Sequence, residues 1–148
     1  MRFRFPLQTI LDLRGGLEHQ EEIRLRFANQ QVHKVQHRIE QIDHYVLDCN
    51  GLLAQCISEG TTGAEILLRL DVKDSVQSQR QALQRELIRL EQIREKQQNI
   101  YQEMRRQRET LESLRDSRLR EYKRETTRQR QRILDDLFLS GMTHSRHS

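Results

Sequence analysis

The sequence predicts an all-α protein in which two long helices form an antiparallel coiled-coil hairpin, the second helix being longer than the first and overhanging it. Three observations predict this fold. The 148-residue chain contains a single proline, at position 6, so helices of unusual length can form. Apolar side chains recur at alternating steps of three and four residues, the spacing of helices that pack along one stripe. Charged residues make up 32% and apolar residues 34% of the chain, against typical values of about 25% and about 45–50%, which leaves too little apolar surface for a multi-layer core.

The first helix is expected over about residues 6–57. Pro6 suits the first turn of a helix, where its missing N–H costs nothing. A looser apolar stripe follows, and Gly15 and Gly16 within it each cost about 1 kcal/mol relative to alanine in a helix, so we expect a kink or a frayed start there. Beyond it, ten positions alternate steps of three and four without omission, which predicts a seam packed against a partner helix. This first seam consists of Leu25, Ala28, Val32, Val35, Ile39, Ile42, Val46, Cys49, Leu53 and Cys56.

A loop is expected at about residues 58–63, followed by a second helix over about residues 64–140. The seam of this helix is less regular, and Gln97 and Gln107 interrupt it; polar residues at such positions help to set register or partner choice. The predicted second seam consists of Val76, Leu83, Leu87, Leu90, Ile93, Gln97, Ile100, Met104, Gln107, Leu111 and Leu114. The two helices make one domain over residues 1–141, and residues 142–148 are expected to be a disordered tail.

Folding the chain back at residue 60 places Val35 near residue 85 and Ile10 near residue 110. The second helix then extends about 25 residues past the first, and this overhang carries an apolar cluster with nothing to cover it. Exposed apolar residues at the end of a charged helix indicate a protein-binding site. A helix end that folds back or is disordered is the alternative. The cluster consists of Ile133, Leu134, Leu137, Phe138 and Leu139.

The net charge of +4 is unevenly distributed. Residues 1–70 hold 8 basic and 9 acidic residues, whereas residues 71–148 hold 18 and 13, and Arg105 to Arg132 alone holds 11 and 5. This asymmetry fits an acidic protein partner at least as well as a nucleic acid. No apolar run approaches the ~18 residues of a membrane span, and the first residues do not resemble a secretory signal.

No motif predicts catalysis, a cofactor or a metal. His33, His37 and His44 fall on the outward face of the first helix, and no cysteine or carboxylate cluster completes a metal site. Gly60 to Gly63 lacks the Lys-Ser/Thr of a phosphate-binding loop, so the chain is not expected to bind or hydrolyse ATP. Cys49 and Cys56 are one heptad apart in the seam, where we expect small, buried, reduced side chains.

Three segments resemble the flagellar type III export protein family FliJ. Residues 3–14, FRFPLQTILDLR, resemble the family's opening segment. The turn at Gly60-Thr-Thr-Gly63 is similar to the mid-chain reversal of the family, and residues 133–138, ILDDLF, resemble its closing segment. The length and layout of the chain also match from end to end.

The resemblance implies a non-catalytic, stalk-like antiparallel coiled coil of the flagellar export apparatus. Its partners would be the hexameric export ATPase, the membrane export gate and export chaperones, with no nucleic acid and no small-molecule substrate. The resemblance implies a cytoplasmic location, peripheral at the cytoplasmic face of the cell membrane. We expect the ATPase-facing end to comprise Phe3, Phe5, Leu7, Ile10, Leu11, Leu134, Leu137 and Phe138, with electrostatic steering by Arg118, Arg124, Arg128 and Arg132. For the export gate, only the body of the hairpin is indicated.

Two other functions compete with this interpretation. The first is a general coiled-coil adaptor or chaperone unrelated to flagella. The second is a basic hairpin that binds RNA or DNA, which the interleaved acidic residues and the scarcity of aromatic platforms disfavour.

Overall fold

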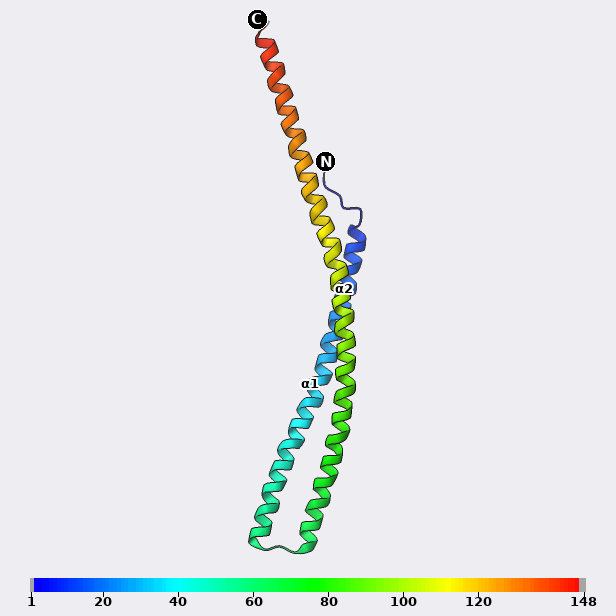
Figure 1. Ribbon diagram of the computed structural model, residues 1–148, viewed down its shortest axis with the longest axis vertical. Helices are drawn as coiled ribbons and strands as arrows, with labels where there is room; N and C mark the ends of the chain where they lie inside the picture. Colours follow the sequence, from blue (N-terminus) through cyan, green and yellow to red (C-terminus); the bar gives the residue numbers. More distant parts are fainter. Residues whose placement is uncertain (1, 147–148) are drawn as a thin grey trace. The chain divides into compact units, whose positions relative to one another are not determined.

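The computed structural model describes residues 2–146, and within them the chain forms two α-helices and no strand. Helix α1 spans Gln8–Glu59 and helix α2 spans Gly63–Ser145, with lengths of 52 and 83 residues. The two helices pack against each other as an antiparallel hairpin (Figure 1). The predicted fold class, including the longer second helix, is confirmed.

The chain divides into two compact units, each built from a stretch of α1 and a stretch of α2. The hairpin unit is His19–Gln102 and contains the loop between the helices. The terminal unit combines the residues through Glu18 with those from Glu103 onward. The contacts of the chain gather around these two groups, and the single domain expected over residues 1–141 stays a prediction.

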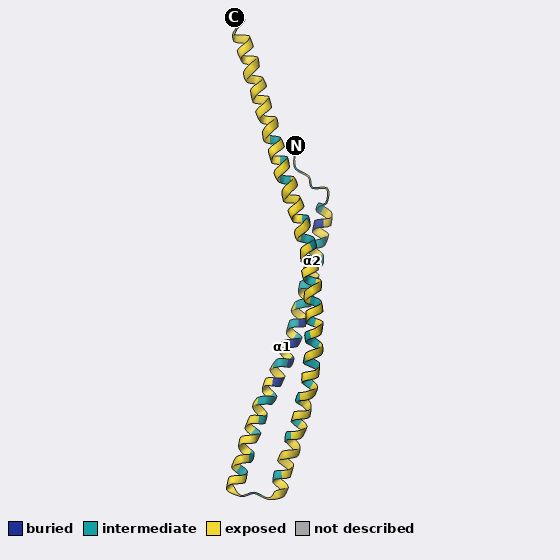
Figure 2. Cartoon of the chain, in the orientation of Figure 1, coloured by how far each residue is buried: buried dark blue, intermediate teal, exposed yellow. Residues whose placement is uncertain are grey.

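The first seam forms the core of the hairpin unit. All ten predicted positions are buried or half-buried, and Val32 is fully buried. Ala28, Val35 and Ile39 are the other buried residues of this unit, so the core is one narrow stripe (Figure 2). The prediction for this seam is confirmed because its spacing keeps each apolar side chain on the face toward α2.

The second seam is shifted from the predicted one by a single residue at two places, and the last predicted position, Leu114, is 37% exposed. Ile93 and Ile100 are each 43% exposed, whereas the neighbouring Arg94 and Tyr101 are half-buried. Continuing the steps of three and four from Leu90 leads to these two positions, and the aliphatic stem of an arginine can cover apolar surface there. The prediction of Ile93 and Ile100 as seam residues was therefore wrong.

Local hydrogen bonds define where the helices begin and end. Helix α1 starts at Gln8 rather than at Pro6, after a turn in which the Gln8 N–H donates to the Phe5 carbonyl at 3.1 Å. It continues without interruption past Gly15 and Gly16, where we had expected a kink or a frayed start. Its end is followed by Gly60, whose φ of 82° lies in the left-handed region that glycine favours after a helix.

Helix α2 begins with a cap and ends later than expected. The Glu65 N–H donates to the Thr62 hydroxyl at 3.4 Å, and the Glu65 carboxylate accepts from Thr61. The connection between the helices is therefore residues 60–62, within the expected loop. At the other end, α2 runs to Ser145, so residues 142–145 of the expected tail are helical, and residues 147–148 lie outside the described part of the chain.

Candidate functional site

Residues 2–7 form a non-helical segment that packs on α2 within the terminal unit. We call residues 2–7 the N-terminal strap. The rings of Phe3 and Tyr122 lie 5.5 Å apart between centroids at an angle of 48°, a favourable tilted arrangement for aromatic rings. Phe5 and Leu7 are also half-buried, and Leu11, in the first turn after the strap, is buried.

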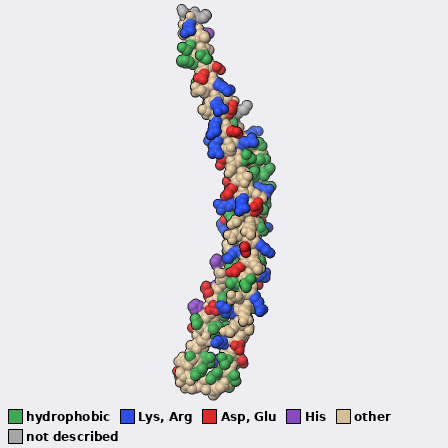
Figure 3. Space-filling model, viewed as in Figure 1, with side chains coloured by type: hydrophobic (Ala, Val, Ile, Leu, Met, Phe, Trp, Pro, Cys, Tyr) green, Lys and Arg blue, Asp and Glu red, His purple; other side chains and the backbone are tan. Residues whose placement is uncertain are grey.

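Beyond the strap, α2 is exposed on all sides. Every residue from 127 to 146 is exposed, and six large apolar side chains in this stretch have exposed fractions between 48% and 68%. We call these six residues the C-terminal apolar cluster. They are Ile133, Leu134, Leu137, Phe138, Leu139 and Met142. Hydrophobic side chains gather near the C-terminal end of α2 in the space-filling view (Figure 3).

The eight apolar residues expected to form one ATPase-facing end fall into two groups. Those of the strap and the first turn pack inward, apart from Ile10, which is 44% exposed, whereas Leu134, Leu137 and Phe138 are exposed. Phe3 contacts α2 at Tyr122, twelve residues before Leu134 and therefore about 18 Å from it along the helix axis. The strap therefore lies beside arginines of α2 that were predicted to steer the partner, and it does not reach the apolar cluster.

The strap and α2 line an open cleft of about 730 Å³. Five arginines line it, two from the strap and three from α2, and three of them are predicted steering residues. Within residues 2–146, none of the five forms an ion pair. We call this site the arginine cleft. Its lining is Arg2, Phe3, Arg4, Pro6, Arg118, Glu121, Tyr122, Arg124, Glu125 and Arg128, so the fourth predicted steering residue, Arg132, lies outside it.

Arginines in the packed part of the terminal unit have internal partners instead. Arg108 binds the carboxylate of Glu18 on α1 and that of Glu112 at 2.6 Å, and only 24% of its side chain is exposed. The hydrogen bond to Glu18 is the main cause that raises the pKa of Arg108. Arg14 donates to the Gln107 side chain at 2.6 Å. These contacts join α1 to α2 and thereby fix their register.

The hairpin unit has polar contacts of the same kind. Arg80 binds Asp43 with a distance of 2.6 Å between Nε and Oδ1, and this hydrogen bond raises the pKa of Arg80. Gln97 donates to the Glu21 carbonyl at 3.3 Å and to the Glu21 carboxylate. Gln97 is half-buried, so its predicted place in the seam is confirmed, and its bond to Glu21 links the two helices at that level.

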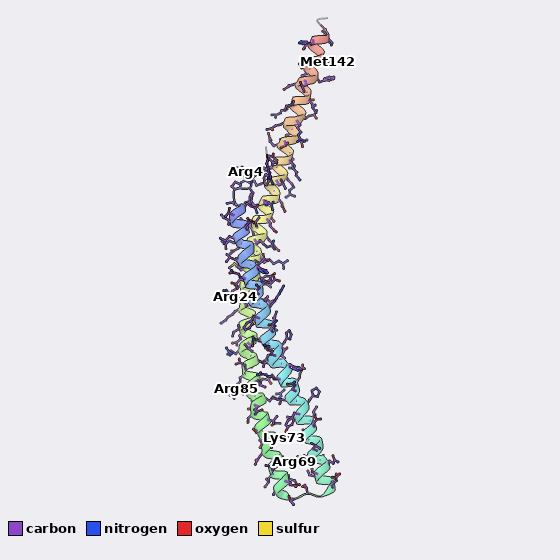
Figure 4. The ribbon with its side chains drawn as sticks, turned by 180° about the vertical axis from the view of Figure 1, so that it is seen from behind. Arg4, Arg24, Arg69, Lys73, Arg85 and Met142 are labelled. Atoms are coloured by element: carbon purple, nitrogen blue, oxygen red, sulfur yellow. The ribbon has the colours of Figure 1, made fainter. Side chains whose placement is uncertain are left out.

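Three open clefts lie between the helices of the hairpin unit. One of about 520 Å³ is lined by Ile23, Phe27 and Ile93 among others, and these three apolar side chains are exposed. A second, of about 690 Å³, and a third, of about 500 Å³, share Tyr45. The third is reached by Arg69 and Lys73 from α2, both labelled in Figure 4. Ile23 and Phe27 lie outside the first seam at helical spacing, and this off-seam pair is the signal in the sequence that indicates the first cleft.

The histidines of α1 and the two cysteines, which were considered for metal or redox chemistry, do not form a cluster. His33, His37 and His44 are exposed on α1, and no group of three metal-ligating side chains occurs within residues 2–146. Cys49 and Cys56 are free and half-buried, and the hydrogen bond with the Cys49 thiol raises the pKa of Tyr45. Neither helix has, in its described part, a stretch apolar enough over the required length to span a membrane.

Two long helices that pack through one seam, with an exposed apolar and cationic end, define a coiled-coil hairpin protein. A family model described as flagellar FliJ protein matches residues 3–148, and the chain belongs to this family. It is therefore a component of the flagellar export apparatus, in the type III secretion class. No curated protein and no solved structure matches the chain.

Proposed function

We propose that this protein is a non-catalytic coiled-coil stalk that binds the hexameric flagellar export ATPase and the membrane export gate and so promotes export of flagellar proteins. It also engages export chaperones. It works in the cytoplasm, at the cytoplasmic face of the cell membrane. Family membership supports a place in the export machinery, and the exposed surfaces of the two units support the particular contacts.

The observation that carries the ATPase contact is the C-terminal apolar cluster. Six large apolar side chains on one exposed helix end lose contact with water when a partner covers them, which favours association. Arg118, Arg124, Arg128 and Arg132 are exposed on the preceding turns and attract an acidic partner surface before contact. Phe3 contributes indirectly, because its ring contact with Tyr122 holds the strap against α2. Phe5, Leu7 and Leu11 are half-buried or buried, and Ile10 is exposed.

The ATPase contact is tested by changing the cluster without changing the fold. Leu134→Ser combined with Leu137→Ser and Phe138→Ser removes apolar surface from an exposed helix end. We expect capture of the export ATPase of the source cell to fall by at least about tenfold, equivalent to about 1.4 kcal/mol. Leu67→Ser with Leu68→Ser is the matched control, because both leucines are 65% exposed near the other end of α2. Equal capture by the cluster variant and the wild type refutes this contact.

The clefts of the hairpin unit support the gate contact. Phe27 is 62% exposed beside Ile23 and Ile93, and a partner side chain that enters this cleft covers all three. Phe27→Ser is expected to weaken binding to the cytoplasmic part of the export gate and to leave ATPase capture unchanged. A chain that binds neither the gate nor the ATPase supports the alternative of a general coiled-coil adaptor or chaperone.

A further inference from the structure

The arginine cleft concentrates positive charge in a small space. Its lining holds five arginines and two glutamates, a net charge of +3, and its volume of about 730 Å³ lies in the range of about 300–1,000 Å³ that small ligands occupy. The walls come from two elements, the strap and α2, and Arg4 lies on the strap beside α2 (Figure 4). Glu121 and Glu125 line the same cleft, and neither is ion-paired within residues 2–146.

Two opposing interactions act on the strap. The aromatic contact of Phe3 with Tyr122 holds it on α2. The charges of Arg2 and Arg4 oppose this, because docking brings them to the same cleft as Arg118, Arg124 and Arg128. An anion in the cleft reverses the sign of this electrostatic effect, since it attracts both walls at once.

We propose that the arginine cleft binds a compact multivalent anion of the polyphosphate class, and that binding fixes the N-terminal strap on α2. Guanidinium groups form paired, charge-assisted hydrogen bonds with phosphate oxygens. Polyphosphate concentrates several negative charges within a few ångströms, which matches several arginines around one cleft, whereas carboxylates on a peptide are spread along its length. The site goes beyond the proposed function, although Arg118, Arg124 and Arg128 serve in both. Binding of the anion needs only this chain, so its test does not depend on the ATPase contact.

The binding test measures, by calorimetry at low ionic strength, the affinity of the full-length chain for inorganic tripolyphosphate. We expect Arg4→Gln and Arg124→Gln each to weaken binding about tenfold, equivalent to about 1.4 kcal/mol, because each removes a charge-assisted hydrogen bond. Arg120→Gln is the matched control: it removes the same charge from an exposed position of α2 outside the lining of the cleft. Absence of binding by the wild type, or equal weakening by Arg120→Gln, overturns the proposal.

A second measurement follows the strap itself. Amide hydrogen exchange over residues 3–8, including the Gln8 N–H that bonds to Phe5, is expected to slow severalfold when tripolyphosphate is added. Phe3→Ala is expected to abolish the slowing because it removes the aromatic contact. Binding without any slowing refutes the coupling to the strap. Tighter binding of a glutamate-rich peptide than of tripolyphosphate refutes the ligand class.

Discussion

The first seam of the hairpin unit and the C-terminal apolar cluster are built from similar residues and have opposite surroundings. Val32 is fully buried, whereas Phe138 is 68% exposed, although both lie in long helices with charged residues around them. The difference is the partner: the first seam faces α2, while every residue from 127 to 146 is exposed. Apolar spacing thus identifies which face of a helix is suited to packing, and the extent of the neighbouring element decides whether that face is covered.

The largest expected effect on stability is the difference between an aspartate placed in the first seam and one placed in the C-terminal apolar cluster. Val32→Asp places a carboxylate in a fully buried position and is expected to lower the free energy of unfolding by about 4 kcal/mol. Leu134→Asp changes a side chain that is 60% exposed and is expected to alter it by less than about 0.5 kcal/mol. Urea unfolding followed by circular dichroism measures both, and similar losses for the two variants contradict the contrast.

The fold follows from the sequence because its determinants are local and periodic. The spacing from Leu25 to Cys56 is that of a helix packed along one stripe, and glycine and threonine at residues 60–63 allow the chain to reverse. The contacts between Glu21 and Gln97 and between Asp43 and Arg80 centre on residues 59 to 62, as folding back at residue 60 predicts. The prediction for Ile93 and Ile100 was wrong because the seam was assigned to apolar residues. At these two levels the half-buried positions are instead Arg94 and Tyr101.

The candidate site was predictable only in part. Exposure of Leu134, Leu137 and Phe138 follows from counting residues past the end of the first helix. The contact of Phe3 with Tyr122 does not, because residues 2–7 are not helical and their path over α2 has no periodic signal. The arginine cleft depends on that path, so sequence spacing alone predicts a basic helix and does not predict the cleft.

An intermediate effect on stability is expected at Gly15 and Gly16, where α1 is helical although glycine does not favour a helix. A Cβ added at either position meets no atom within 4 Å. Gly15→Ala with Gly16→Ala is therefore expected to raise the free energy of unfolding by about 1–2 kcal/mol, since alanine favours helix over glycine by about 0.8–1.0 kcal/mol per residue. Urea unfolding detects this gain, and a loss of stability shows that the glycines have a packing role that the structure does not contain.

A smaller effect distinguishes paired from unpaired arginines of α2. Arg108→Gln removes the contacts with Glu18 and Glu112 and is expected to cost about 1 kcal/mol, whereas Arg120→Gln is expected to cost less than about 0.3 kcal/mol. Combining Arg108→Gln with Glu18→Gln in a double-mutant cycle isolates the bond between the helices. A coupling energy near zero shows that this ion pair does not contribute to register.

Little change in stability is expected from the largest change in the chain. Deleting residues 133–148 removes the C-terminal apolar cluster, yet residues 133–146 are all exposed and the strap contacts lie earlier, at Tyr122 and the arginine cleft. The free energy of unfolding is therefore expected to change by less than about 0.5 kcal/mol, because no buried apolar contact is lost. The deletion lowers ATPase capture in the same preparation if the cluster is the contact surface. A stability loss comparable to that of Val32→Asp instead means that another part of the chain covers the cluster in solution, and the contrast between the two regions then disappears.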